Sequence, residues 1–343
     1  MKFKLFYLFV IALLLTSCLE NDIISTLDIQ LNDSALLIKY IEDKGDFPNS
    51  VEAPALITAQ EVYDNLTSLW ILDIRKHEDY LSGHIEYSIN IQPERLLRTI
   101  DSLNNVQPLR RIVLVGNNGQ ESSYYNCLLR LAGYNNVFNL HFGMASWNND
   151  FANDWFSALG VAAGIVNYNN TLYDKNNLTE LPAMLFPDSI KSTEGKFNFR
   201  LSVLIYEGFN TEFQYLNRLS NISQAYVICY GVGRLYYAPL YVPYGEAGHP
   251  ENTKWYQTSP LYEFRSSKDL QTLPSDKTII VYSGDGHESA CIVAYLRFLG
   301  YNAKTVLYGA NQLFYPRLLG DPEIVKYAFS QSDVHNFPYV TGE

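Results

Sequence analysis

Apolar residues in the middle of the chain fall into short continuous runs separated by segments with helical spacing. Runs of strand length lie at 69–73, 88–91, 111–115 and 137–140. Segments that predict helices lie at 59–68, 77–81, 93–103 and in a stretch that ends at Ala132. After Arg111 the run at 111–115 is continuously apolar, as in a strand buried on both faces. Strands that alternate with helices predict an α/β fold with a mostly parallel sheet covered by helices on both faces.

Part of this pattern occurs twice. Residues 112–122 recur at 279–289, and each copy has an apolar run followed by a loop with glycine and the residues Glu-Ser. The match continues at the same offset, since Gly133-Tyr134-Asn135 corresponds to Gly300-Tyr301-Asn302. A strand, loop, helix and Gly-Tyr-Asn repeated in one register predict two copies of one domain in tandem.

The N-terminus has the features of an export signal. Lys2 and Lys4 precede an apolar run at 5–15, which is shorter than the ~20 residues of a membrane-spanning helix. The next residues, Leu15-Thr16-Ser17-Cys18, resemble the lipobox of bacterial lipoproteins, in which the cysteine is acylated and becomes the new N-terminus. The resemblance implies a membrane partner through lipidated Cys18 and a place in the cell envelope, with the outer membrane favoured. The alternative is an ordinary secretory signal with a chance cysteine.

These patterns divide the chain into six parts. The predicted boundaries are a signal peptide at 1–17, a lipid-anchored tether with a short helix at 18–55, a first domain at 56–159, a linker or insertion at 160–197, a second domain at 198–325 and a C-terminal tail at 326–343. The short helix is expected around 35–42.

Charge and cysteine usage restrict the partners. The formal net charge is −11, and removal of the two lysines of the signal takes it to −13. This charge argues against nucleic acid and anionic lipid headgroups as partners. The cysteines beyond Cys18 are Cys127, Cys229 and Cys291, an odd number with no Cys-x-x-Cys and no Cys/His cluster at zinc spacing. We therefore predict no disulfide framework, no metal site and no cofactor.

Several motifs of the first copy together resemble the rhodanese family of sulfurtransferase domains. The early motifs are Leu72-Asp73-Ile74-Arg75 and Gly83-His84-Ile85, and the late motifs are Gly133–Val137 and Gly143–Trp147. The resemblance implies two tandem rhodanese-like domains. In such a domain, Asp73 with Arg75 is expected to form a structural ion pair and His84 to brace a turn, so these residues indicate fold and not activity.

The second copy resembles the family less at its front half. Tyr226-Val227-Ile228-Cys229 occupies the place of the aspartate-bearing strand, and Gly248-His249 follows a longer insertion. Its back half, from Thr278 to about Tyr315, matches well. The second domain is therefore expected to be a degenerate copy.

The family places its nucleophilic cysteine directly after the central strand, in a loop whose backbone N–H groups stabilise a persulfide. The corresponding loops here are Gly116, Asn117, Asn118, Gly119, Gln120 and Glu121 in the first copy and Ser283, Gly284, Asp285, Gly286, His287 and Glu288 in the second. Glycine offers no nucleophile, and a serine hydroxyl is a poor substitute that forms no persulfide. Each copy also has a glutamate where the family commonly has an arginine. These carboxylates either cap the following helix or repel an anionic sulfur donor.

Three functions remain open. The first is a membrane-anchored, non-catalytic rhodanese-like protein that binds an envelope protein or a small ligand, with tyrosine-rich residues 235–241 as contact surface or as core. The second is a sulfurtransferase or persulfide carrier with a relocated cysteine, for which Cys291 is the leading candidate and Cys127 and Cys229 are weaker. The third is a structural envelope lipoprotein. A hydrolase that uses Ser283 with His287 lacks a recognisable orienting carboxylate.

Overall fold

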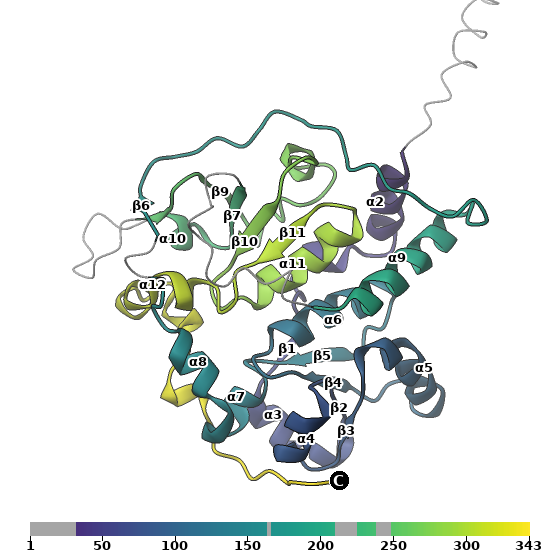
Figure 1. Cartoon of the computed structure of the whole chain (residues 1–343), viewed down its shortest axis with the longest axis vertical. Coiled ribbons are helices and arrows are strands. Elements are labelled where there is room, and N and C mark those ends of the chain that lie inside the picture. Colours follow the sequence, from purple (N-terminus) through teal and green to yellow (C-terminus); the bar gives the residue numbers. More distant parts are fainter. Residues whose placement is uncertain (1–31, 163–165, 210–224, 238–247) are drawn as a thin grey trace, which may run out of the picture.

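The computed structural model describes residues 32–162, 166–209, 225–237 and 248–343. Two parallel sheets lie at opposite ends of the molecule, with a layer of helices between them (Figure 1). No helix of the described residues is long and apolar enough to cross a membrane. The predicted signal peptide and Cys18 lie outside the described residues.

The first sheet has five parallel strands in the order β1-β5-β4-β2-β3. The strands are β1 (Leu56–Ile57), β2 (Trp70–Asp73), β3 (Ser88–Asn90), β4 (Ile112–Val115) and β5 (Val137–Leu140). The helices of this half are α3 (Ala59–Asp64), α4 (His77–Ser82), α5 (Leu96–Val106), α6 (Gln120–Leu131), α7 (Met144–Trp147) and α8 (Asn153–Ala158).

The second sheet has four parallel strands in the order β11-β10-β7-β9. These are β7 (Tyr226–Tyr230), β9 (Thr253–Tyr256), β10 (Ile279–Tyr282) and β11 (Ala303–Thr305). The helices are α9 (Thr193–Glu207), α10 (Gly233–Tyr236), α11 (His287–Phe298) and α12 (Ala310–Gly320). Its strand order repeats the β5-β4-β2-β3 part of the first sheet, so the repeat in the sequence is also a repeat in topology.

Both faces of each sheet are buried. In the central strand β4, Ile112 and Leu114 pack into one core, while Val113 and Val115 pack into another on the opposite face. The second sheet repeats this division between its own two cores. The prediction of an α/β fold with two tandem domains, each with a mostly parallel sheet covered on both faces, is confirmed.

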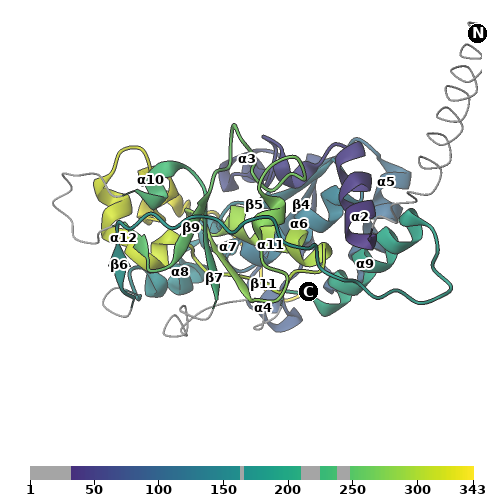
Figure 2. The same ribbon diagram turned by 90° about the horizontal axis from the view of Figure 1, so that it is seen from above.

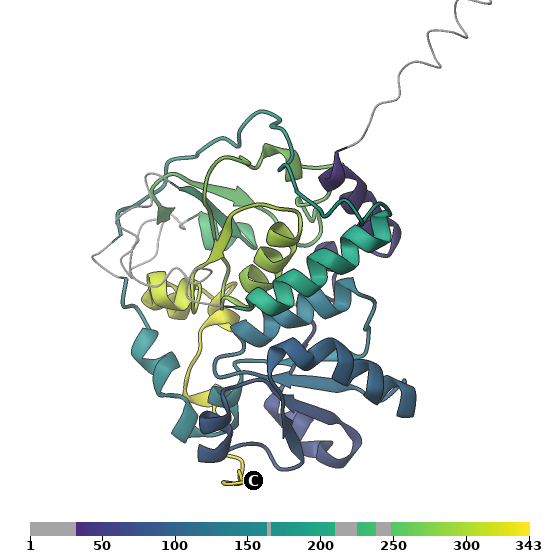
Figure 3. The same ribbon diagram turned by 45° about the vertical axis from the view of Figure 1, so that its right-hand side comes forward.

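The two domains share one continuous core. Helices α6 and α11 pack against each other between the sheets, and α9 lies alongside them (Figure 3). Helix α2 (Asp33–Asp43) packs on α9 at one end of the molecule (Figure 2), and its Leu37, Ile38 and Ile41 belong to the same core. The short helix predicted within 18–55 is therefore present, and its apolar face packs into the core that the two domains share.

The C-terminal segment is also part of the fold. It runs back from the second domain to the first (Figure 1), where Val340 forms an antiparallel bridge with His84. The indole Nε1 of Trp147 donates to the Pro338 carbonyl at 2.9 Å, and Phe337 stacks on Tyr63 at 4.1 Å between ring centroids. The segment predicted as a C-terminal tail at 326–343 therefore packs on the first domain and connects it to the second.

The segment between the domains is partly structured. A short strand β6 (Tyr168–Asn169) pairs antiparallel with β8 (His249–Pro250), and α9 begins at Thr193, inside the predicted linker at 160–197. Between β6 and α9, Lys175 forms ion pairs with Glu263 and Asp269. The linker therefore lies along the second domain, and only its irregular middle fits the prediction.

Candidate functional site

The early motif of the first domain forms a buried ion pair. The Arg75 guanidinium donates to both carboxylate oxygens of Asp73 at 2.7–3.1 Å and to the Gly83 carbonyl at 2.7 Å. Both side chains are almost fully buried. His84 contacts the Tyr80 carbonyl through Nδ1 at 2.9 Å and stacks on the Tyr80 ring. These contacts give the three motif residues the structural roles that the sequence predicts for them.

The second domain has an equivalent arrangement of a buried arginine and a stacked histidine, formed by different residues. His249 contacts the Tyr236 carbonyl through Nδ1 at 3.0 Å and stacks on the Tyr236 ring, as His84 does with Tyr80. The carbonyl of Gly248 accepts from a buried arginine, Arg317, which comes from α12 and not from the end of a strand. In the second domain, the guanidinium of Arg317 in α12 thus takes the place of the guanidinium of Arg75, which follows strand β2 in the first domain.

The two loops at the family's active-site position pack against each other across the domain interface. Gly119 and Gly286 precede α6 and α11 with φ of +83° and +88°. A Cβ on Gly119 would lie 2.4 Å from Nε2 of His287, and one on Gly286 would lie 2.0 Å from Nε2 of Gln120. Only glycine leaves room for the side chain of the opposite loop at these points.

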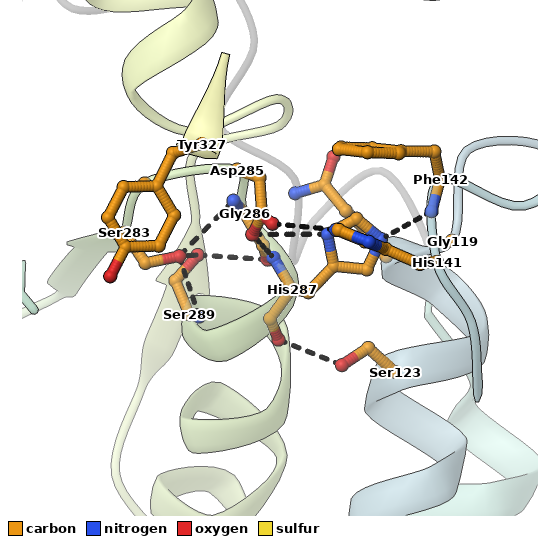
Figure 4. Close-up of polar contacts among 12 residues, drawn as sticks. Gly119, Ser123, His141, Phe142, Ser283, Asp285, Gly286, His287, Ser289 and Tyr327 are labelled. Atoms are coloured by element: carbon orange, nitrogen blue, oxygen red, sulfur yellow. Dashed lines mark hydrogen bonds and ion pairs between the residues drawn. The ribbon is translucent and has the colours of Figure 1, made fainter. Parts of the chain in front are cut away.

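Gln120 and His287 occupy matching places in the repeat. The side chain of each accepts a hydrogen bond from a backbone N–H group of the other domain. The backbone N–H of Tyr308 donates to Oε1 of Gln120 at 2.7 Å, and the N–H of Phe142 donates to Nε2 of His287 at 3.2 Å. Ser123 also donates to the His287 carbonyl at 2.8 Å (Figure 4). Each loop therefore inserts one polar side chain into the other domain, which makes the loop pair a structural junction.

Ser283 fills the ring of N–H donors in the second loop. Its Oγ accepts from the backbone N–H groups of Gly286 and Ser289, at 3.2 and 3.1 Å, and donates to Oγ of Ser289 (Figure 4). The hydroxyl thus occupies the place of a thiolate sulfur. Both ring nitrogens of His287 face other groups, so the serine has no base. This arrangement does not support the hydrolase alternative.

The second loop is also closed to solvent. Residues 283–287 are buried, and the Tyr327 ring covers the loop so closely that a Cβ on Gly284 would lie 2.3 Å from it. In the first loop, by contrast, Asn117 is exposed and Asn118 is partly exposed. The first loop is therefore the more exposed of the two, and Gly116 at its start carries no nucleophile.

A His-Asp-His cluster joins the loop pair. Asp285 lies between His141 of the first domain, 3.0 Å from Oδ2 to Nε2, and His287, 3.1 Å from Oδ1 to Nδ1 (Figure 4). Burial works against the ionised Asp285, but the two imidazoles outweigh it and hold its pKa well below its usual range. Burial lowers the pKa of His287, although the Asp285 carboxylate opposes this. Sequence reasoning names Asp285 and His287 in one loop but does not recognise Asp285 as the carboxylate beside His287, and it misses His141, which lies in neither loop.

The cluster has the residue types of a metal site. The donor atoms of His141, Asp285 and His287 lie within 4.8 Å of one another. However, Nε2 of His287 accepts the Phe142 N–H, so Nδ1 carries the proton and faces Asp285. A metal ion on Nδ1 would move that proton to Nε2, where it would oppose the N–H of Phe142. The hydrogen bonds therefore favour a metal-free cluster that holds the domains together.

The two loop glutamates differ from simple helix caps. Glu121 and Glu288 lie in the first turns of α6 and α11, but the first N–H group of each helix donates to another side chain, Asn118 at 3.0 Å and Asp285 at 3.1 Å. Burial, with nearby carboxylates as a smaller cause, raises the pKa of Glu121 to about 7 and that of Glu288 to about 8. Each domain thus keeps a carboxyl group that is costly to ionise.

The remaining cysteines lie in the cores. Cys229 is fully buried in β7, and burial raises the pKa of its thiol to about 12. Cys127 and Cys291 face each other between α6 and α11, and burial raises the pKa of Cys127 well above its usual value. Cys291 is 2% exposed and lines a cavity together with Glu288. It does not supply the atom inside the second loop's ring of N–H donors, because that atom is Oγ of Ser283.

Comparison with known proteins agrees with this architecture. Residues 58–150 match the sequence model of the rhodanese-like domain. No curated protein matches the chain. The first domain is therefore rhodanese-like, a class defined by homology to sulfurtransferases.

Similar solved structures span either the first domain or most of the chain. A rhodanese-related protein from Thermoplasma volcanium is 22% identical over 27% of this chain and 89% of its own, with a TM-score of 0.23. The rhodanese-like domain of an Anabaena protein is 27% identical over 26% of this chain and 70% of its own, with a TM-score of 0.24. A thiosulfate sulfurtransferase from Pseudomonas aeruginosa is 13% identical over 88% of this chain and 69% of its own, with a TM-score of 0.26. The fold assignment itself rests on the strand order and register described above.

Proposed function

We propose that this protein is a non-catalytic, lipid-anchored binding protein of the bacterial cell envelope, built from two rhodanese-like domains. It binds a small ligand or an envelope protein and transfers no sulfur. The observation that carries the proposal is the state of the two loops. The first has Gly116 at the nucleophile position, and in the second Ser283 fills the ring of N–H donors beneath Tyr327.

The charge of the loops supports the same proposal. Sulfur transfer from thiosulfate would bring a dianion to the N-terminus of α6 or α11. The carboxyl groups of Glu121 and Glu288 lie in the first turns of these helices. A carboxyl group there supplies no positive charge, whereas the basic residue common in the family would attract an incoming anion.

A turnover assay tests the absence of sulfur transfer. Attack of a thiolate on thiosulfate forms a persulfide and releases sulfite, and a dithiol acceptor then regenerates the thiolate. With dithiothreitol as acceptor, we expect the purified full chain to release sulfite no faster than buffer does. A rhodanese with its loop cysteine serves as positive control. Sulfite release that Cys291→Ala abolishes would refute the non-catalytic proposal.

The anchoring part of the proposal has its own prediction. Replacement of Cys18 by serine removes the acylation site, and several acyl chains each contribute about 0.8 kcal/mol per buried methylene group. We expect the wild-type chain in the membrane fraction and Cys18→Ser either unprocessed or released from lipid. The measurement is fractionation with intact mass of the N-terminal peptide. An unacylated mature wild-type N-terminus would contradict the anchor.

One observation favours the second candidate function, a persulfide carrier. Cys291 lines a cavity and is therefore within reach of a small molecule that enters it. Loss of any sulfur transfer in Cys291→Ala, with no change in Cys229→Ala, would identify this function.

A further inference from the structure

The segment between β6 and α9 carries leucine side chains that face solvent. It follows the outer edge of the second domain (Figure 1), and its Leu172, Leu178 and Leu185 are 65%, 72% and 94% exposed. Leu185 is the most exposed large apolar side chain of the described residues. A single exposed leucine is ordinary, but three of the seven that the described ranges expose fall between positions 172 and 185. Apolar side chains gathered in this way indicate contact with another apolar body.

The neighbours of Leu185 hold it in solvent. Met184 packs at the C-terminal end of α11, where a Cβ on Gly300 would lie 3.0 Å from its side chain. The Phe186 ring contacts that of Phe199 in α9 at 6.0 Å between centroids. Met184 and Phe186 both lie against the core that the two domains share. Because the residues on either side are packed inward, the side chain of Leu185 is directed outward by the fold.

This loop, residues 181–191, lies beside the point where the proposed lipid anchor joins the fold. The hydroxyl of Ser34, in the first turn of α2, donates to the Pro182 carbonyl. Asn32 is the N-cap of α2, and Cys18 precedes it by 14 positions. Covalent geometry limits a chain of that length to about 50 Å. Of the described residues, the first turn of α2 is therefore the part nearest to the lipid along the chain, and the Leu185 loop contacts it.

The charges around the loop indicate the class of lipid. Asp188, Lys191 and Glu194 are exposed beside Leu185, so both signs are present and neither predominates. An anionic membrane surface attracts clusters of lysine and arginine, which this loop lacks. The negative charge of the whole chain also opposes an anionic surface. A lipid with zwitterionic headgroups fits these residues best.

We propose that the Leu185 loop rests on the membrane that holds the lipid anchor, with Leu185 at the boundary between headgroups and acyl chains. The inference rests on the proposed anchor and deepens it by naming the face and the class of lipid. Burial of one leucine favours the contact by roughly tenfold to hundredfold. That is too little to recruit a free protein but enough to orient one that a tether already holds at the surface. The α2 end of the molecule then faces the lipid, and the α12 end faces away (Figures 1 and 2).

Site-directed spin labelling of the acylated full chain in phosphatidylcholine vesicles tests the proposal. One variant carries a nitroxide at Leu185→Cys, and the control carries it at Leu319→Cys in α12, where the leucine is 51% exposed. The three core cysteines are buried, and labelled wild type gives the background. We expect the label at position 185 to gain collisions with oxygen, which concentrates in lipid, and to lose collisions with a water-soluble nickel complex. Equal access of the nickel complex to both labels would overturn the proposal.

Flotation of the same vesicles separates failure of the anchor from failure of the orientation. A wild-type chain that does not float with the lipid refutes the anchor, and the inference falls with it. A chain that floats while its label at position 185 stays in water refutes the orientation alone. In phosphatidylglycerol vesicles at low salt we expect the label at position 185 to be more accessible to the nickel complex than in phosphatidylcholine. Deeper insertion into phosphatidylglycerol would overturn the proposed class of lipid.

Discussion

Replacement of Arg75 by methionine is expected to lower the free energy of unfolding by about 3–5 kcal/mol. The change leaves Asp73 buried with its charge uncompensated and removes the donor to the Gly83 carbonyl. Urea denaturation followed by circular dichroism measures the effect. The loss should be smaller for the double variant Asp73→Leu with Arg75→Met, because an apolar pair leaves no unpaired charge.

A surface ion pair in the same domain provides the matched control. Arg111 pairs with Glu61, and their side chains are 36% and 45% exposed. Arg111→Met is expected to cost no more than about 1 kcal/mol. Equal losses for Arg75→Met and Arg111→Met would show that the buried ion pair does not support the first domain as described.

Replacement of Trp155 by alanine is expected to cost about 3–5 kcal/mol and to destabilise both domains together. Trp155 is fully buried, and its ring contacts Phe142 of the first domain at 5.0 Å between centroids. It also contacts Tyr308 and Phe329, each at 4.8 Å. Its removal leaves a cavity at the junction where the loop pair and the C-terminal segment meet.

The shared core makes the shape of the unfolding transition informative. Since α6, α9 and α11 belong to one core that spans both domains, we expect a single transition in the wild type and in Trp155→Ala. Trp155→Phe keeps an aromatic ring in the cluster and should cost clearly less. Two separate transitions, or a loss confined to one domain by hydrogen exchange, would contradict the description of one cooperative unit.

The sequence predicts the parts of the fold that local patterns determine. The run at 137–140 matches β5, and the run at 111–115 matches β4 except for its first residue. The predicted helix at 93–103 instead begins as a single 3₁₀ turn at Pro93–Arg95 and continues as α5 to Val106. Residues 59–68 likewise split into α3 and a 3₁₀ turn at Leu66–Ser68. Periodicity gives the element type, whereas its ends depend on contacts that periodicity does not contain.

Contacts between distant segments account for what the sequence does not predict. The two-residue strands β1, β6 and β8 carry no period of their own and exist only through their partners. Helix α2 and the C-terminal segment have ordinary amphipathic or irregular sequences, and their burial depends on how the two domains stack. The same stacking brings His141 to Asp285, across 144 positions of the chain.

In the candidate site, too, local sequence patterns predict some features, while others depend on contacts between distant segments. The resemblance to the rhodanese family implies that its nucleophile would occupy Gly116, and the repeat transfers this position to Ser283, because the two loops align without a gap. The repeat does not reveal that Gln120 and His287 cross into the opposite domain, since a polar residue after glycine fits an ordinary helix start equally well.

The most direct test of the account is the intact mass of the purified full chain after incubation with thiosulfate. Chains alkylated beforehand and Cys291→Ala are measured in parallel. The account predicts that the folded wild-type chain gains no sulfur, because neither loop presents a nucleophile to solvent. A gain of one sulfur atom that disappears in Cys291→Ala would contradict it and would identify a sulfurtransferase with a relocated cysteine.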